Sequence, residues 1–479
     1  MSNSSLIIFG LLVPLLSALG SYFFQKNINL RDSFGVIGGI ITFIISLIIF
    51  DGIQNFQEFS ISLFPLIQGV DFTFRVTPLG SIFSLVASSL WILASIYTIG
   101  YMRGAAEDNQ TRFVIFYSIA IHAALAIAWS GNLLVLFIFY EILTFSTFPL
   151  VGHKQNAESQ AAGRVYLSIL VGTSLMLFLP AIFWIWFQTG TLDFKSGGIL
   201  EGKFPTEYLS FLVALLVFGI GKAAIMPIHR WLPAAMVAPT PVSALLHAVA
   251  VVKAGVFSFL VVVVYIIGPE YLFESKASDW LIWLASFTIL ASSIIAISKD
   301  DLKARLAYST ISQLSYIILG AALATTFAIK GASFHIITHA IGKITLFFCA
   351  GAIYVTAHVK KISQLNGLGY KTPLISGNPS HGRLAKDAAV FREEVRQCNA
   401  TIAPRHTVGQ HTIQKRLSVG PGYVIFCKTG QVDEPYPFAH GCAFVAHHLE
   451  YIIAPVTVIL LSTIEGKPLG PLPAKGLGV

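Results

Sequence analysis

Charged residues are scarce in this chain of 479 amino acids, since Asp, Glu, Lys and Arg together make up 11% of it. Ordinary soluble domains carry about 25%. Hydrophobic residues make up 55% of the chain. So little charge excludes an array of water-soluble domains and predicts a protein whose main solvent is lipid.

Cysteine is also rare, and the four positions show no paired ligand spacing. This excludes a disulfide framework, and neither these cysteines nor the histidines near the C-terminus match a metal-ligand template. No flavin, nicotinamide or iron–sulfur motif occurs, so we expect no cofactor and no metal. The chain has no redox motif of its own, and the sequence leaves open whether it is part of an enzyme.

Basic residues exceed acidic ones and give a formal net charge of +8. They are scattered through loops without aromatic interleaving or long basic blocks, so the pattern does not favour nucleic acid. It favours the surface of a lipid bilayer as the partner.

Long hydrophobic runs dominate what is present. A segment needs about 20 residues to cross the bilayer core. We predict an all-α polytopic bundle of about eleven such helices within residues 1–372, the first being a retained helix and no signal peptide. The predicted spans are 5–24, 35–50, 79–100, 113–130, 132–152, 165–187, 208–227, 241–267, 279–298, 306–325 and 332–356.

The short loops predict an orientation, because Lys and Arg are retained on the cytoplasmic side. With the N-terminus outside, the inside loops hold more basic residues than the outside loops. The inside set is Lys26, Arg31, Arg103, Arg112, Lys154, Arg164, Arg230, Lys299, Lys303 and Arg305, and the outside set is Arg75, Lys195, Lys203, Lys276 and Lys330.

One span is predicted to be broken, because residues 227–241 contain four prolines and each removes a helix donor. We expect the interruption between about Ile225 and Thr240, with Lys222 beside it and Pro241 near the start of the next helix. Non-helical backbone at membrane depth marks ion sites in transporters. The alternative is a proline-rich surface loop.

Four ionisable residues lie near the centres of predicted spans: Glu141, Lys222, Lys253 and Lys343. A charge in this position costs several kcal/mol on insertion scales, which makes it a candidate functional group. We predict that Glu141 and Lys222 lie within reach of an ion pair, forming an electrostatic gate for protons. A static ion pair or snorkelling to the interface is the alternative for any single residue.

Histidines extend this set. His335, His339 and Lys343 are spaced by four and share one helical face, which we expect to point into the bundle as a proton relay, with Ile336 and Leu346 on an opposite, more apolar face. His247 and Lys253 are six residues apart, so they point roughly 120° from each other. For His247, a buried histidine bonded to backbone remains the alternative.

The segment from Gly221 to Gly255 combines a GK pair, HRWLP and TPVSALLHA, and it is joined by DLKARLAYSTISQLSY at 301–316 and HIITHAIGKITLFFCAGA at 335–352. This set resembles the antiporter-like subunits shared by Mrp-type cation/proton antiporters, respiratory complex I and membrane-bound hydrogenases. The resemblance covers residues from about 70 to 372.

The resemblance implies a bundle of about fourteen helices with two inverted repeats. It places the glutamate and lysine of the first half on Glu141 and Lys222, and the relay on His247, Lys253, His335, His339 and Lys343. The family continues with a second broken helix that residues 373–479 do not offer. We therefore expect an atypical, poorly ordered tail after a change of reading frame near residue 372, and impaired transport; a short paralogue is the alternative.

The function predicted is a proton-translocating subunit of a multisubunit monovalent cation/proton antiporter, nearest to the D-like kind. The partners would be other membrane subunits, protons, sodium and the lipid bilayer, in a cell (inner) membrane. The alternatives are a proton-pumping membrane-arm subunit of an NADH:quinone oxidoreductase and an inactive, structural remnant.

Overall fold

The computed structural model describes residues 3–365, which lie within one compact unit, Met1–Ala400. The division expected at residue 372 and the tail 373–479 lie outside the described residues. The α-helices are α1 Asn3–Phe23, α2 Ile28–Gln54, α3 Pro78–Gly104, α4 Gln110–Ala128, α5 Leu133–Val151, α6 Ala157–Thr173, α7 Leu179–Thr189, α8 Thr206–Gly219, α9 Trp231–Ala234, α10 Thr240–Ala244, α11 Val251–Val261, α12 Pro269–Ser275, α13 Asp279–Ser298, α14 Leu302–Ala322 and α15 Thr326–Ala357.

Short helical turns of other types join or follow some of these helices. Three π-helical turns cover Ser174–Phe178, Leu245–Val249 and Val262–Ile267, and 3-10 turns cover Gly221–Ala223, Ile228–Arg230, Ala235–Val237 and Ile362–Gln364. The first π-turn joins α6 to α7, the second lies between α10 and α11, and the third extends α11, so that each set forms a continuous run.

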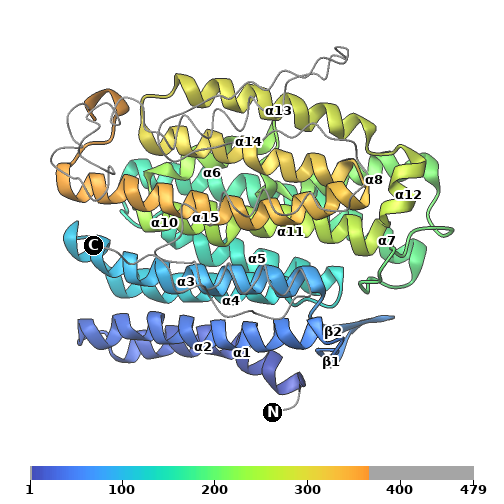
Figure 1. Ribbon diagram of the computed structural model, residues 1–479, viewed down its shortest axis with the longest axis horizontal. Helices are drawn as coiled ribbons and strands as arrows, with labels where there is room; N and C mark the ends of the chain where they lie inside the picture. The colour runs from blue at the N-terminus through green and yellow to red at the C-terminus, as the bar shows by residue number, and fades with distance from the viewer. Residues whose placement is uncertain (1–2, 366–479) are drawn as a thin grey trace, which may run out of the picture. The chain divides into compact units, whose positions relative to one another are not determined.

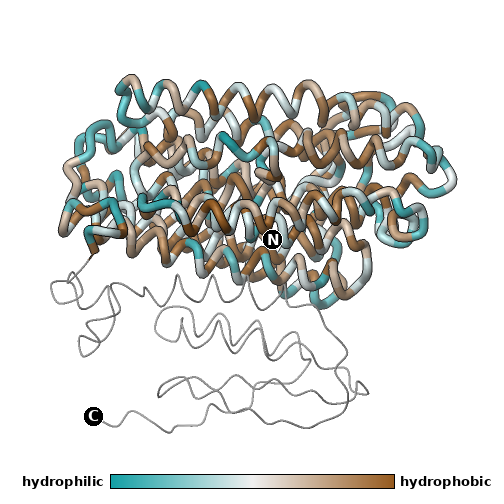
Figure 2. The backbone as a smooth tube through the Cα atoms, turned by 90° about the horizontal axis from the view of Figure 1, so that it is seen from above, coloured by the Kyte–Doolittle hydropathy of each residue, from teal (hydrophilic) through white to brown (hydrophobic). Residues whose placement is uncertain are grey.

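Every span expected from the sequence overlaps one of these helices or continuous runs, although the span 208–227 extends past the end of α8. Within residues 3–365, nine helices are long and apolar enough to cross a membrane. The helix Thr206–Gly219 is apolar but shorter, because the chain breaks after it, and α14 is not among the nine. Figure 2 shows that hydrophobic residues follow the helices and that hydrophilic residues gather near their ends.

Polar residues set where several helices begin. The side chains of Asn27, Thr77, Asn132, Asn156, Asp301 and Thr325 each accept a hydrogen bond from a backbone N–H in the first turn of the following helix. Such caps satisfy donors that have no partner inside the helix. In α3 the cap is followed by Pro78, a residue that suits the first helical position.

The helices run side by side in layers (Figure 1). The pair α1 and α2 lies along one side, α3 to α5 come next, and α10, α11 and α15 lie in the middle, followed by α14 and α13. The run Thr240–Ile267 is the most enclosed span, with 89% of its apolar window buried. The centre of the bundle is therefore where ionisable side chains are furthest from solvent.

A β-hairpin was not anticipated from the sequence. Strands β1 Ser60–Ile67 and β2 Val70–Arg75 pair antiparallel, and Gly69 adopts φ +77° in the turn. The hairpin is tied to the bundle by backbone hydrogen bonds from Arg75 to Trp129 and from Gly131 to Thr73, both 2.8 Å. Alternating side chains in VDFTFR carried the signal for a strand, although the protein is otherwise helical.

Candidate functional site

The helix that begins with α8 is broken, as the prolines predict. It ends at Gly219, a 3-10 turn covers Gly221–Ala223, the four-residue α9 follows, and the next long helical run begins at Thr240 with Pro241 in its first turn. The break starts about five residues earlier than expected from Ile225. Lys222 therefore lies inside the break and not beside it.

Three features hold the broken backbone in place. Ala224 adopts φ +55°, a left-handed conformation that reverses the chain after the 3-10 turn. The indole Nε1 of Trp231 donates to the carbonyl oxygen of Gly221 at 3.0 Å. On the other side, Gly255 of α11 packs directly on the backbone of Lys222 and Ala223, where an added Cβ would clash.

Lys222 is fully buried and its ammonium is held by α5. Its Nζ donates to the carbonyl oxygen of Tyr140 at 2.8 Å and to the hydroxyl of Thr144 at 2.6 Å. The same Nζ lies 3.1 Å from the centroid of the Tyr140 ring, and the Tyr140 hydroxyl accepts from the backbone N–H of Lys222 at 3.0 Å. These contacts replace the hydration that an ammonium loses on burial.

Within residues 3–365, Glu141 and Lys222 do not form the expected ion pair at 4.0 Å or less. Among residues 3–365, the ion pairs within 4.0 Å join Asp32 to Arg31 and to Arg103. Both carboxylate oxygens of Glu141 are buried without a hydrogen-bond partner in the described part of the chain. The reason is rotational: Tyr140 and Thr144, one turn apart on α5, face Lys222, whereas Glu141 points about 100° away from Tyr140.

Lys253 and His339 join α11 to α15. The Lys253 Nζ lies 2.5 Å from Nδ1 of His339, and the two residues are 1% and 7% exposed. A hydrogen bond between an amine and an imidazole needs one N–H and one lone pair, so both groups cannot be fully protonated at once. One hydrogen therefore lies between the two nitrogens in the interior.

His335 and Lys343 flank His339 on α15. The rings of His335 and His339 stack with centroids 6.0 Å apart and 4° between their planes. The ammonium of Lys343, 1% exposed, donates to the hydroxyl of Ser309 on α14. The expected inward position is confirmed for His339 and Lys343, whereas His335 is half-buried.

Ile336 and Leu346 were predicted to lie on the face of α15 opposite the histidines and Lys343, and this assignment is wrong. Ile336 and Leu346 are also buried, with 4% and 9% exposure. The exposed positions in this part of the helix are Gly342 and Thr345. Neighbouring elements contact α15 on several sides, among them α14, α10 and α3. The buried residues of α15 therefore do not lie on one face only.

His247 lies in the π-helical turn Leu245–Val249, fully buried, and neither ring nitrogen has a hydrogen-bond partner among the described residues. Its ring lies 4.9 Å from that of Phe347 on α15. Lys253 also contacts α15, although regular helical spacing predicts that the two residues diverge. The π-turn widens the helix by one residue and changes their angular relationship.

Sequence reasoning missed three polar contributors. Tyr140 and Thr144 lie on either side of Glu141 in the sequence. Their spacing of four residues places them on one face of α5, and this spacing could have identified them as a pair that faces Lys222. Lys303 was assigned to a loop, but it lies in the first turn of α14 and its Nζ donates to the carbonyl oxygen of Ala238 at 2.5 Å. It thereby satisfies a backbone group released by the break.

Together the fold and the site define a polytopic membrane protein with a broken helix and with lysines and histidines buried in its interior. The family model described as "NADH:quinone oxidoreductase/Mrp antiporter, TM" matches residues 130–378. The chain belongs to this family.

Curated relatives come from both branches of the family. A probable K(+)/H(+) antiporter subunit of Rhizobium meliloti (strain 1021) is 34% identical over 312 residues, covering 64% of this chain and 30% of that protein. An "NAD(P)H-quinone oxidoreductase chain 5" of Synechocystis sp. is 34% identical over 285 residues, covering 57% of this chain and 40% of that protein. The chain therefore spans less than half the length of these two relatives.

Two solved structures share the fold. One chain of the archaeal membrane-bound sulfane sulfur reductase superposes with a TM-score of 0.69 at 22% identity, covering 83% of this chain and 82% of that chain. One chain of the Mrp complex from Dietzia sp. DQ12-45-1b gives 0.64 at 22% identity, covering 82% and 46%. The chain is thus a multi-pass membrane protein of the antiporter-like type.

Proposed function

We propose that this chain is a proton-translocating subunit of a multisubunit monovalent cation/proton antiporter. The observation that carries the proposal is the hydrogen bond between Lys253 and His339. Two bases that share one proton in an almost dry interior pass it on with little rearrangement, whereas a fixed structural cation would need a permanent acceptor. The named relatives and the fold support the same class.

The proposed path starts at Glu141 and Lys222 and continues through Lys253 and His339 to Lys343. Both carboxylate oxygens of Glu141 are buried without a hydrogen-bond partner among residues 3–365, so its proton is exchanged with a mobile group and not with a fixed ion-pair partner. His247 and His335 lie beside the path and supply further acceptors. Partner membrane subunits, sodium as coupling ion, the cell membrane and an external N-terminus belong to this proposal.

A membrane-arm subunit of an NADH:quinone oxidoreductase is the second candidate. It is supported by the same 34% identity to a chain 5 of such an enzyme. Both candidates use the same buried lysines, so the chemistry proposed for this chain is common to them.

The test is ion exchange with partner subunits present. Expressed with them in an antiporter-deficient host, the chain should give a cation-dependent collapse of a pH gradient in everted vesicles that is weaker than that of a longer family member, since transport is expected to be impaired. Lys253→Ala should abolish this signal, and Lys330→Ala, which removes an exposed lysine of α15, should leave it unchanged. Equal exchange by both variants would refute the proposed path. Exchange driven by NADH and lost with a quinone-site inhibitor would favour the second candidate.

A further inference from the structure

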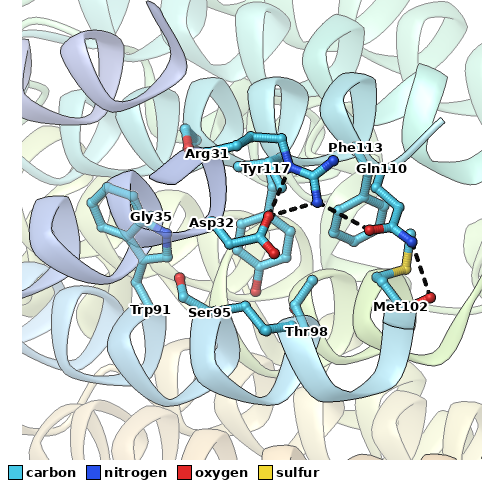
Figure 3. Close-up of a pocket in the computed structure, with 13 residues that line it drawn as sticks. Arg31, Asp32, Gly35, Trp91, Ser95, Thr98, Met102, Gln110, Phe113 and Tyr117 are labelled. Carbon is cyan, nitrogen blue, oxygen red and sulfur yellow. Dashed lines mark hydrogen bonds and ion pairs between the residues drawn. The ribbon is translucent and has the colours of Figure 1, made fainter. Parts of the chain in front are cut away.

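A cavity lies apart from the lysines and histidines, between α2, α3 and α4 (Figure 3). The enclosed space is about 30 Å³, and the volume rises to about 430 Å³ only when the open mouth is counted. Along α3 its lining runs from Trp91 to Met102, which corresponds to roughly 16 Å at 1.5 Å per residue. The cavity is therefore an elongated slot parallel to the helices.

One end of the slot carries paired charges. Arg31 donates through Nε to one oxygen of Asp32 at 2.7 Å, and Arg103 donates to the other at 2.6 Å. Arg31 also reaches Gln110 at the start of α4, as Figure 3 shows. Two guanidiniums around one carboxylate leave a net charge of +1 at this end.

Part of this charge is available to a ligand through Arg103, which contacts the lining residue Asp32 but does not itself line the slot. The side chain of Arg103 is 39% exposed, and its hydrogen bonds use Nε and Nη2, which leaves Nη1 without a partner among the described residues. A planar guanidinium with free N–H groups is well suited to a phosphate.

Further inside, two hydroxyls lack partners. Thr98 and Tyr117 both line the slot, are 6% and 4% exposed, and have hydroxyl oxygens without hydrogen bonds in the described part of the protein. Buried hydroxyls are normally satisfied. Beside them the walls are apolar, with Trp91, Ile99 and Val114, so the lining is amphipathic.

We propose that this slot binds the headgroup of an anionic phospholipid. The phosphate lies against Arg103 and Arg31, and the polar atoms of the headgroup reach the hydroxyls of Thr98 and Tyr117. Three observations favour a lipid: the charges lie where α2 and α4 begin and α3 ends, the net charge there is positive, and the walls are apolar. Basic residues at such helix ends attract anionic lipid surfaces.

The test uses the purified full chain in detergent, with phosphatidylglycerol, phosphatidylethanolamine or inorganic phosphate added separately. Bound lipid is counted by native mass spectrometry, and stabilisation is followed by thermal unfolding. Arg103→Gln should weaken phosphatidylglycerol binding about tenfold or more, as expected for losing a charged donor. Arg164→Gln, an exposed arginine outside the slot, is the matched control and should change nothing.

Tyr117→Phe tests whether weaker lipid binding reflects a lost contact with the lipid or a destabilised protein. It removes a hydroxyl that makes no hydrogen bond in the described protein. It should keep the melting temperature of the lipid-free protein and weaken phosphatidylglycerol binding by about two- to tenfold. Equal binding of the two lipids, unchanged binding by Tyr117→Phe, or stabilisation by phosphate alone that matches the lipid would each overturn the proposal.

Discussion

The Nζ atom of Lys253 and the Nδ1 atom of His339 lie 2.5 Å apart in the interior of the bundle. The two residues are 86 positions apart in the sequence, on α11 and α15. The contact is thus a product of the fold, and it gives the most direct way to separate proton transfer from structural support.

His339→Gln should abolish ion exchange while keeping the protein folded. The amide oxygen of glutamine accepts a hydrogen bond from Lys253, but an amide does not take up a proton near neutral pH. Exchange is measured in everted vesicles and folding by thermal unfolding of the purified chain. His358→Asn, at the exposed end of α15, is the control, and undiminished exchange by His339→Gln would contradict the relay.

Thr144→Val should impair the support of Lys222. Valine keeps the shape of threonine but removes the hydroxyl that accepts from Nζ at 2.6 Å. Losing a hydrogen bond to a charged group costs about 1.5–3 kcal/mol, so both stability and exchange should fall. Thr345→Val, exposed on α15 and bonded only to its own helix, should stay within about 0.5 kcal/mol. An equal effect of the two changes would argue against this role.

Gly255→Ala should destabilise the packing of α11 against the broken segment at Lys222 and Ala223. The added methyl group would meet the backbone of Lys222 and Ala223, and overpacking of this kind costs about 1–3 kcal/mol. Gly342→Ala places the same methyl group in open space on α15, so it should be neutral or stabilising by up to about 1 kcal/mol. Chemical or thermal unfolding of the two variants, measured side by side, distinguishes the outcomes.

Acid should destabilise the protein partly through His153, which follows α5 outside the membrane-spanning segments. Burial, assisted by the nearby Arg112 guanidinium, lowers the pKa of His153 from 6.5 to about 4. The unfolded chain therefore binds a proton more readily than the folded chain. Stability from this residue is complete above pH 6.5 and is lost as pH falls toward about 4, since protonation favours unfolding there.

Melting temperatures measured between pH 7 and pH 4 test this expectation. The decline should be shallower for His153→Gln, which has no titrating group, than for the unchanged protein. His358→Asn removes an exposed histidine and should leave the slope as it is. A slope that is the same in all three proteins would show that other groups control the acid response.

The sequence predicted the helices well because lipid imposes one strong requirement, a long apolar segment that satisfies its own backbone. The break was predictable for a similar reason, since Pro227 and Pro241 remove helix donors. The hairpin Ser60–Arg75 was missed because its alternating pattern is short and lies between much stronger helical signals.

The partners of the buried charges were harder to predict. Glu141 and Lys222 were paired by charge alone, but the distance between two helices does not fix which residue of a turn faces the other. In the structure Tyr140 and Thr144 take that position. Likewise, the π-turn at Leu245–Val249 changes the direction of His247 relative to Lys253. No residue type in this segment predicts a π-turn, so this change could not be expected from the sequence.

The length of α15 has a further consequence. Its 32 residues extend about 48 Å, whereas the hydrocarbon layer is about 30 Å thick. The helix must therefore tilt or project beyond that layer at one or both ends. His339 and Lys343 lie close to the midpoint of Thr326–Ala357, so a thinner or thicker bilayer would change the dry distance between these residues and the water on either side.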